Sequence, residues 1–419
     1  MALESKLYFD KRETLEREER ENILFENFSK KLKTIASLSV GWKNILSSCN
    51  LDNIKSRNDL CSIPITRKSS LTNMQKDVFP YGGLTTKSYN QFPYIFASPG
   101  PIYEPGDHND FWNMSRGLYA AGLRKEILAY NTFSYHLGPA GLMMQNAANN
   151  IGSTVIPGGT GNTELQIETI CNLKPSFYIG TPSFLKILHE IAKKNNNDIS
   201  CFRNGLVGAE PLTTALRNEL SNNGTDVLQM YGIAEAGCIA YETKDLEKNL
   251  NHGMIIEEDI ILEIVRPGTL HAVPHGDVGE IVITKISSEY PVIRLGTGDL
   301  SKIISDPSPC GRTNLRIQGW MGRAEQSTKF KGIFVTIDQL NKVVNTFKEI
   351  SKVRFIITTK DFIDNGELLC ETKDRSDQFN SKVKEFFKNN FKLNINVSFV
   401  NEGSIPNDGL VIEDKRILD

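Results

Sequence analysis

The chain has 419 residues, of which 39% are hydrophobic and 23% are charged, and its formal net charge is −2. This length exceeds what one hydrophobic core usually organises, so two or more domains are expected, and the composition is typical of a soluble globular protein. The small negative charge lacks the basic footprint of nucleic-acid-binding proteins and therefore argues against that class.

The N-terminal segment MALESKLYFDKRETLEREER lacks the apolar centre of a secretory signal. No run of the sequence approaches the roughly 18 apolar residues that a membrane span needs. The seven cysteines are scattered without a CxxC pair, which is typical of reduced thiols rather than of a disulfide framework. We therefore expect a cytoplasmic protein with no membrane association.

Two kinds of pattern occupy the first 260 residues. Residues 11–46 place apolar side chains near helical spacing among charges, which predicts helices. From about residue 110 onward helical and strand-like segments alternate, and we expect strands at 152–157 and 176–180 and helices at 164–173 and 182–194. Such alternation predicts an α/β domain with parallel strands.

Beyond residue 260 the sequence becomes rich in strand-like segments, namely IILEIV, GEIVITKI and YPVIRL. The pattern of predicted elements changes again near Gly322. About the last ninety residues are typical of a small α+β unit with its own amphipathic helices. We therefore predict an N-terminal domain of residues 1–323 and a C-terminal domain of residues 324–419.

Residues 94–107, YIFASPGPIYEPGD, raise a separate question. A strand, a Gly/Ser turn and a helix are the usual way to build a phosphate cradle from backbone N–H groups, and a helix-like run follows at residues 111–121. This turn, however, contains Pro99, Pro101 and Glu104. The sequence by itself leaves open whether the segment is a nucleotide loop, a degraded one or an ordinary turn.

Four further stretches carry candidate chemistry, and each also has a structural explanation. In chain order, the first could simply be a strand end before a helix and the second a turn that presents Glu235 to solvent. The third could be a hairpin turn, and the fourth a hinge at Gly322 and Arg323. In chain order they are VGAEPLT (207–213), QMYGIAEAG (229–237), PVIRLGTGDLS (291–301) and GWMGRAEQSTKFKG (319–332).

Together, in this order, the four stretches resemble the adenylate-forming superfamily and, within it, the phenylacetate–CoA ligase-like branch. PITRKSSL, NTFSYHLGPAG, TVIPGGTGNTELQIE and SPCGRTNLRI extend the likeness over nearly the whole chain. The resemblance implies an α/β fold with a large N-terminal adenylate-forming domain of parallel or mixed sheets and a small mobile α+β C-terminal domain. It also implies an AMP-forming ligase, in which a carboxylic acid reacts with ATP to give acyl-AMP and CoA then displaces AMP.

The resemblance assigns roles to particular residues. Asp299 would accept hydrogen bonds from the ribose hydroxyls, as carboxylates do well. Glu235 would hold Mg²⁺, an oxygen-seeking ion, and Arg323 would contact ribose or phosphate; these two are the catalytic candidates. Glu325, or its neighbour Gln326, would be the hinge about which the small domain rotates. The nucleotide pocket would further contain Gly208, Ala209, Glu210, Pro211, Tyr231 and Gly232, and the acyl pocket Phe133, Tyr135 and His136.

Three expectations around this assignment stay open at the level of sequence. His136 could serve as a base, although a buried structural histidine is the alternative. Cys310 has no matching metal ligands nearby, because Glu242 and Ile255 occupy the places where partners would be sought, and a lone cysteine does not make a zinc site. The resemblance, rather than any pattern in the chain, suggests a homodimer and an aryl acid as substrate.

The chain departs from the branch in the 94–107 segment. The branch pattern ASSGTTGKP aligns with ASPGPIYEP at residues 97–105, so that Ser98 and Gly100 keep their places. Pro99 and Pro101 remove two backbone donors and two hydroxyls, and Glu104 stands where a lysine would face the phosphates. Each hydrogen bond to a charged group contributes roughly 1.5–3 kcal/mol, so this loop should not hold the β- and γ-phosphates in the ordinary way.

A second departure lies near the C-terminus. Gly409 is followed by Leu410, where the branch has the lysine that stabilises charge during adenylation. Lys415 could replace it only if the tail changes register; otherwise Lys415 and Arg416 simply solvate the tail. Both departures fall on the step that activates ATP.

The sequence is therefore compatible with two functions. The first is a working ligase that makes a CoA thioester with an unconventional grip on the phosphates. The second is a protein that binds AMP, acyl-adenylate or acyl-CoA without activating acids, or that starts from a preformed activated acyl group. The fold alone does not separate them.

Overall fold

The structure, a computed structural model, describes residues 7–287, 289–324, 327–331, 333–360, 363–406, 408 and 410–416. It forms two compact units, which are described separately below. Unit 1 comprises Met1–Glu263, Val282–Thr297 and Ile303–Trp320, and unit 2 comprises Ile264–Ile281, Gly298–Lys302 and Met321–Asp419.

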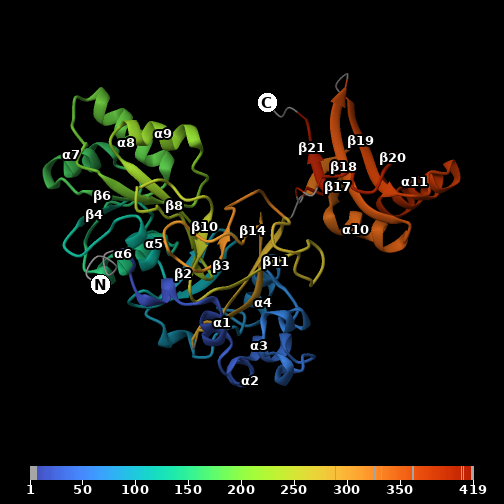
Figure 1. Cartoon of the computed structure of the whole chain (residues 1–419), viewed down its shortest axis with the longest axis horizontal. Coiled ribbons are helices and arrows are strands. Elements are labelled where there is room, and N and C mark those ends of the chain that lie inside the picture. Colours follow the sequence, from blue (N-terminus) through green and yellow to red (C-terminus); the bar gives the residue numbers. More distant parts are fainter. Residues whose placement is uncertain are drawn as a thin grey trace. The chain divides into compact units, whose positions relative to one another are not determined.

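The N-terminal helices predicted at residues 11–46 are present as three separate helices. Asn27, with φ of 54°, divides the first from the second, and the Ser39 hydroxyl accepts the Trp42 N–H at 3.2 Å where the third begins. The helices of this region, which Figure 1 shows in blue, are α1 (Arg17–Phe25), α2 (Phe28–Leu38), α3 (Val40–Ile45) and, further on, α4 (Lys68–Asp77).

A nine-stranded sheet organises most of unit 1. Its order is β14-β15-β10-β9-β8-β7-β6-β4-β5, and the five strands from β8 to β5 are parallel. The strands are β4 (Leu128–Asn131), β5 (Thr154–Pro157), β6 (Phe177–Gly180), β7 (Asn204–Val207), β8 (Asp226–Ile233), β9 (Gly237–Tyr241), β10 (Met254–Ile256), β14 (Ile303–Ile304) and β15 (Arg316–Ile317).

Helices cover both faces of the parallel strands, as Figure 1 shows, and the central strands β4, β6 and β7 are almost entirely buried. Ala129 and Phe177 pack into one core with α5 and α6, whereas the neighbouring Tyr130 and Tyr178 pack into a second core with α7, α8 and α9. The predicted α/β architecture is confirmed. The helices are α5 (Ser115–Ala120), α6 (Ala140–Ile151), α7 (Thr163–Leu173), α8 (Pro182–Lys194) and α9 (Thr214–Asn222).

A second sheet has the order β1-β13-β12-β11, and the chain crosses between the two units within its longer strands. The hairpin of β2 and β3 stands apart as a two-stranded sheet. These strands are β1 (Thr66–Arg67), β2 (Tyr94–Ser98), β3 (Ile102–Gly106), β11 (Ile261–Val265), β12 (Gly279–Lys285) and β13 (Val292–Ser301).

Unit 2 contains an α+β arrangement with its own hydrophobic core. In α11 the buried residues Phe379, Val383, Phe387 and Phe391 recur every fourth position and face the sheet β20-β19-β18-β21. This is the small C-terminal α+β domain that the sequence predicts. Its elements are β16 (Ser327–Phe330), β17 (Ile333–Thr336), α10 (Ile337–Thr346), β18 (Ile350–Lys360), β19 (Ile363–Thr372), α11 (Asp377–Phe391), β20 (Asn396–Val400) and β21 (Ile412–Asp414).

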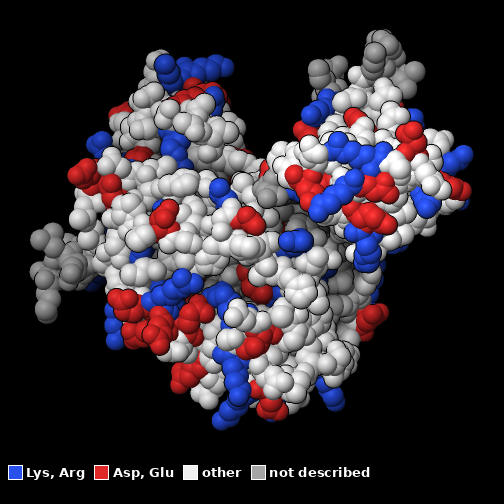
Figure 2. All heavy atoms as spheres, turned by 45° about the vertical axis from the view of Figure 1, so that its right-hand side comes forward, with Lys and Arg blue, Asp and Glu red and all other residues white. Residues whose placement is uncertain are grey.

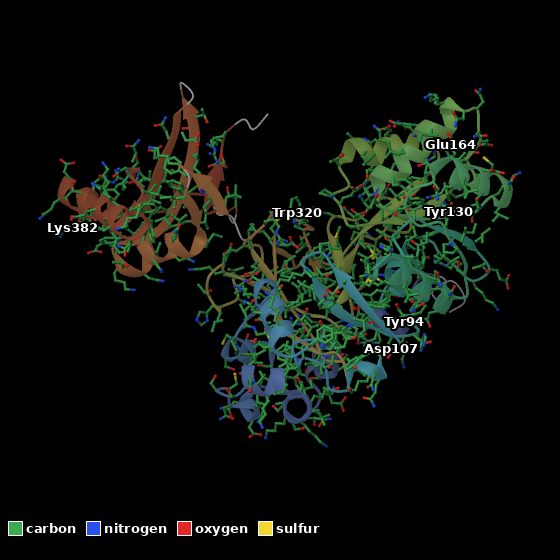
Figure 3. All side chains as sticks on the ribbon, turned by 180° about the vertical axis from the view of Figure 1, so that it is seen from behind. Tyr94, Asp107, Tyr130, Glu164, Trp320 and Lys382 are labelled. Carbon is green, nitrogen blue, oxygen red and sulfur yellow. The ribbon has the colours of Figure 1, made fainter. Side chains whose placement is uncertain are left out.

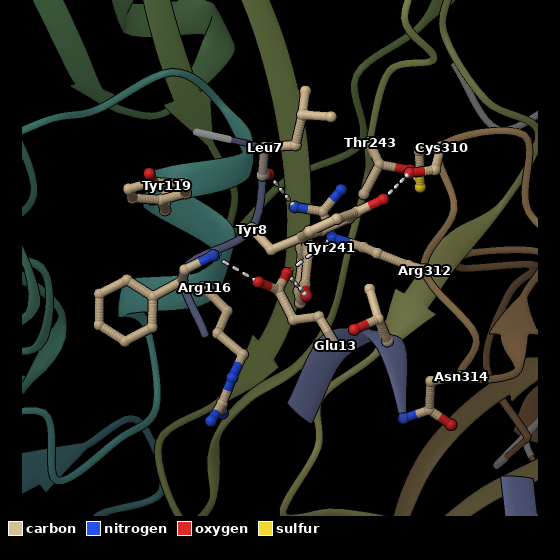
Figure 4. Close-up of polar contacts among 12 residues, drawn as sticks. Leu7, Tyr8, Glu13, Arg116, Tyr119, Tyr241, Thr243, Cys310, Arg312 and Asn314 are labelled. Carbon is tan, nitrogen blue, oxygen red and sulfur yellow. Dashed lines mark hydrogen bonds and ion pairs between the residues drawn. The ribbon is translucent and has the colours of Figure 1, made fainter. Parts of the chain in front are cut away.

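The N-terminal segment of unit 1 is fastened to residues some 300 positions later. The fully buried Glu13 carboxylate accepts from Arg312 Nε at 2.7 Å and from the Tyr241 hydroxyl at 3.1 Å (Figure 4). Tyr8 donates its hydroxyl proton to the Cys310 carbonyl at 3.0 Å. This network holds residues 8–13 against β9 and against residues 310–312.

The surface visible in Figure 2 carries charges of both signs. Figure 2 shows acidic and basic side chains interspersed on the visible face, without a basic stripe. Over the described ranges, the search for a helix with the length and hydropathy of a membrane span finds none.

Candidate active site

The order of the parallel strands creates a position at which ligands commonly bind. From β4 the chain leads to β5 on one side and then to β6 on the other, so the order reverses between β4 and β6. In open α/β sheets, ligands bind beyond the carboxyl ends of the strands at such a reversal. Thr132, directly after β4, hydrogen-bonds the Tyr178 hydroxyl at 2.8 Å, and a side chain at Gly180 would lie 1.9 Å from the Thr132 Oγ1.

The predicted acyl-pocket residues follow β4 at this place. Phe133 is buried in the hydrophobic core, and Tyr135 accepts a hydrogen bond from Asn131 Nδ2 at 2.8 Å. Burial raises the pKa of Tyr135 to about 12, so its hydroxyl stays protonated. His136 is exposed, and its main-chain N–H donates to the Ser134 hydroxyl. The alternative of a buried structural histidine is therefore wrong.

The predicted wall of the nucleotide pocket, Gly208–Pro211, follows β7. Ala209 has φ of 67°, a left-handed conformation that costs a residue with a side chain roughly 1–2 kcal/mol. Glu210 fixes this bend through two hydrogen bonds. Its carboxylate accepts the Ser183 N–H at 2.6 Å, and its main-chain carbonyl accepts Gln229 Nε2–H at 3.0 Å. The bend leaves Ala209 and Pro211 exposed at the carboxyl end of the sheet.

Tyr231 and Gly232 lie on β8, the strand next to β7, so the sheet brings this pair close to the Gly208–Pro211 bend. The pairing of β8 with β9 shifts register between Tyr231 and Gly232. A side chain at Gly232 would lie 2.6 Å from the Gly237 carbonyl, so this irregularity needs glycine. Directly after it the chain turns and presents Glu235.

Glu235 is the buried acid of the site. Its side chain is 1% exposed, and neither carboxylate oxygen receives a hydrogen bond from the part of the chain that the structure describes. The Lys68 ammonium lies 3.0 Å from Oε1, at ion-pair distance but outside hydrogen-bonding geometry. Buried carboxylate oxygens without donors suit a hard cation, so Glu235 fits the expected Mg²⁺ ligand.

The segment 94–107 forms a closed β-hairpin rather than a strand, loop and helix. Ser98 pairs with Ile102 across a three-residue turn, and the expected helix at 111–121 is present only as α5. In Figure 3 Tyr94 and Asp107 lie together at the open end of the hairpin. Because two strands flank the turn, its backbone does not lead into a helix N-terminus as a phosphate cradle would.

Glu104 of the hairpin is buried rather than directed to solvent. It is 0% exposed, and its Oε1 accepts the Ser98 hydroxyl proton at 2.6 Å. Burial raises the pKa of Glu104 to about 8 against the effect of this hydrogen bond, and the Glu235 charge raises it further. Glu104, Glu235 and Lys68 therefore form one electrostatic cluster, in which Ser98 is committed to Glu104.

Asp299 and Arg323 are brought together within unit 2. Arg323 Nη1 donates to Asp299 Oδ1 at 2.8 Å, and the two residues also form an isolated antiparallel bridge. Gly298 has φ of 75°, and a side chain there would lie 2.8 Å from Arg323 Nη2. The guanidinium is half exposed, whereas the Asp299 side chain is 10% exposed. The pair presents both a cation and an acceptor.

The C-terminal candidates are only partly visible. Glu325, Gln326 and Gly409 lie outside the described residues. Leu410 donates its N–H to Asp408 Oδ1 at 3.0 Å, and Lys415 lies 3.2 Å from Glu413. Arg416 does not merely solvate the tail, because it forms ion pairs at 2.6 Å with both Asp364 and Asp414.

Cys310 is held by hydroxyl groups. Its sulfur lies 3.2 Å from the Ser308 hydroxyl and 3.5 Å from the Thr243 hydroxyl. Burial opposes ionisation, but these hydrogen bonds hold the pKa of the Cys310 thiol below its ordinary value. Glu242 is bound by Arg217 at 2.7 Å. Within the described part of the chain, no group of three potential metal ligands surrounds either residue.

Sequence reasoning missed Lys68, Lys285 and the environment of Glu104. Lys68 lies within PITRKSSL, a stretch that contributes only to the family resemblance.

A cavity of about 480 Å³ lies in unit 2 beside Arg266, Asn341 and Lys352. It contains none of the predicted site residues.

Comparisons with known proteins identify relatives of this chain. The family described as AMP-binding enzyme matches residues 110–287. A phenylacetate–coenzyme A ligase from Pseudomonas putida is 31% identical over 72% of this chain and 70% of that protein. The phenylacetate–coenzyme A ligase from Thermus thermophilus is 27% identical over 88% of this chain and 85% of that protein.

Among solved structures, a 2-hydroxyisobutyryl-CoA ligase in an open conformation, in complex with 2-HIB-AMP and CoA, has a similar fold. The TM-score is 0.71 at 20% identity, over 94% of this chain and 91% of that one. At this identity the likeness supports the fold alone.

Proposed function

Because the chain belongs to the phenylacetate–coenzyme A ligase family of AMP-binding enzymes, we propose that it joins a carboxylic acid to the thiol of coenzyme A through an acyl-adenylate. The observation that carries the proposal is the Glu235 carboxylate, buried beside Lys68 at the end of β8, with two oxygens that receive no hydrogen bond from the described residues. Such a carboxylate suits Mg²⁺, an oxygen-seeking ion that would accompany ATP.

The reaction has two steps. In the first, a carboxylate oxygen of the acid attacks the α-phosphorus of ATP, and pyrophosphate leaves. In the second, the CoA sulfur attacks the acyl carbon, its proton passes to solvent or a base, and AMP leaves. The acid binds beyond β4, beside Phe133 and Tyr135, and we propose an aromatic or similarly apolar acid because Phe133 and the protonated Tyr135 offer no anion there.

The chain's own residues bind and orient the nucleotide. The Gly208–Pro211 bend and Tyr231 border the adenine, and Asp299 accepts from the ribose hydroxyls while Arg323 neutralises phosphate charge. Glu235 would hold Mg²⁺, which supplies Lewis-acid stabilisation to the phosphate oxygens when bound. His136 is exposed and is left without a role as a base in either step.

A second candidate function is favoured by the β2–β3 hairpin. Its turn carries two prolines, its Ser98 hydroxyl donates to Glu104, and the buried Glu104 supplies no cation where triphosphate would need one. A protein with this hairpin would bind AMP or an acyl-adenylate and would run the thioester step from a preformed adenylate. Both candidates share the nucleotide pocket and differ in the phosphate grip.

Calorimetric binding of Mg-ATP and, separately, of AMP to the full chain tests the two candidates, since it needs no knowledge of the acid. The ligase predicts that ATP binds more tightly than AMP and that pyrophosphate is released with a suitable aryl acid. The second candidate predicts binding of AMP alone, together with acyl-CoA formation from synthetic acyl-AMP and CoA. If neither nucleotide binds, both candidates are rejected.

A further inference from the structure

Lys285, the last residue of β12, is a half-buried cation that the reaction scheme leaves unused. Its Nζ donates to the main-chain carbonyls of Phe111 at 3.0 Å and of Ala236 at 3.1 Å. Burial lowers the pKa of Lys285, and nearby acids, Glu257 foremost, oppose this effect. Partial burial of an ammonium that donates to carbonyls rather than to a carboxylate costs free energy, so its position calls for a reason.

One of these carbonyls lies on the turn that carries Glu235, and the other lies on a segment bonded to that turn. Ala236 directly follows Glu235, and Phe111 precedes Trp112. The Trp112 carbonyl accepts the Cys238 N–H at 2.9 Å and would lie 2.1 Å from a side chain at Gly237. Two contacts therefore connect the Glu235 turn to residues 111–112. The Cys238 N–H donates to the Trp112 carbonyl, and Lys285 bridges the carbonyls of Phe111 and Ala236.

We propose that Lys285 is a positioning residue that fixes the Ala236 carbonyl and thereby orients the Glu235 carboxylate toward the metal-bound nucleotide. The Glu235 side chain is 1% exposed and is enclosed by its neighbours, so its direction follows from the main chain that carries it. This inference rests on the proposed role of Glu235. Groups that orient a metal ligand from behind typically change metal affinity about 10–100-fold when removed.

The test compares the calorimetric Kd of ATP in Mg²⁺ with that in EDTA, and it also measures the Kd of AMP. The variants are K285M, which keeps length and removes the donors, and E235Q. Lys352→Met is the matched control, because Lys352 also donates to two carbonyls, those of Ile405 at 3.0 Å and Pro406 at 2.9 Å, but in unit 2. K285M is expected to lose about tenfold or more of the Mg²⁺-dependent gain in ATP affinity. Its AMP affinity, and all values for K352M, should match the parent protein.

The outcomes separate this inference from the proposed function. If E235Q loses the Mg²⁺-dependent gain and K285M keeps it, Lys285 does not position Glu235. If the parent shows no such gain, or E235Q keeps it, the role of Glu235 fails and the inference fails with it. An equal loss in K352M would mean general destabilisation and would also overturn it. Circular dichroism checks folding; if K285M does not fold, K285Q, which retains an amide donor without the charge, takes its place.

Discussion

Glu104 is 0% exposed in the folded chain, and its Oε2 receives no hydrogen bond from the residues that the structure covers. Burial raises its pKa from 4.5 to about 8, so at neutral pH the folded protein keeps a proton that the unfolded chain has released. The contribution of this group to stability is therefore complete below the unfolded pKa and is lost as the pH rises toward 8.

This difference predicts a pH dependence of stability. Between about pH 5 and pH 8, Glu104 should lower the free energy of unfolding by up to about 1.4 kcal/mol per pH unit. E104Q cannot ionise and should show a shallower slope in urea unfolding measured across that range. Burial also raises the pKa of Glu257 to about 8, but this background is common to both proteins. Identical slopes in parent and variant would contradict the prediction.

Asp299 provides a test of the ribose contact. Asp299→Asn keeps the shape of the side chain but removes the charge that makes its hydrogen bonds strong, so AMP affinity should fall by about 1.5–3 kcal/mol, or roughly 10–150-fold. Calorimetry measures this loss. Asp364→Asn is the matched control, because Asp364 pairs with Arg416 at 2.6 Å in the same unit and should leave AMP binding unchanged. Parent-like AMP binding by D299N would remove Asp299 from the pocket.

The roles of single residues could be predicted where the residue lies in a recognisable motif. Contacts between segments far apart in the sequence could not. Glu235 and Asp299 were predicted because the short motifs around them resemble those of the adenylate-forming superfamily. The contact between Lys285 and Phe111 joins residues 174 positions apart, and no local pattern encodes it. The burial of Glu104 escaped prediction for a related reason, since alternation along one strand does not show what covers either face.

At the scale of elements, α8 was predicted to its end residues. Pro182 at the first turn, the Thr181 hydroxyl accepting the Phe184 N–H, and two lysines at the last turn mark both ends locally. The β2–β3 hairpin was not predicted, because β3 is defined by its partner and its residues, IYEPG, include Pro105 and Gly106, which seldom occur in strands. Local capping chemistry is readable from sequence, whereas strand pairing is not.

Gly237, in the turn that presents Glu235, leads to a prediction about stability. Gly237 has φ of 82°, and an added side chain would also meet the Trp112 carbonyl at 2.1 Å. Gly237→Ala should therefore destabilise the chain by more than the roughly 1 kcal/mol expected from left-handed strain alone. Urea unfolding measures the loss. Gly224→Ala separates the two causes, because Gly224 has φ of 89° with nothing within 4 Å. Equal losses in both variants would exclude a role for the close contact.

At the scale of the whole molecule, the sequence-based boundary at residue 323 stays a prediction. The hydrophobic core formed by Phe330 to Ile412 draws all of its described residues from the C-terminal segment. We therefore expect residues 321–419, expressed alone, to unfold cooperatively with a free energy of at least about 5 kcal/mol. Thermal and urea unfolding followed by circular dichroism measure this. A fragment without a cooperative transition would show that the segment depends on the rest of the chain.

The fastening of the N-terminal segment has a consequence for biosynthesis. Glu13 is paired with Arg312, 299 positions later, so during synthesis Glu13 leaves the ribosome well before its partner does. At about 5–20 residues per second, that interval lasts roughly 15–60 s. During this time Glu13 lacks the Arg312 side chain, and the segment around Glu13 is available to chaperones or proteases. A slowly translated stretch before Arg312 would lengthen that exposure without altering the finished protein.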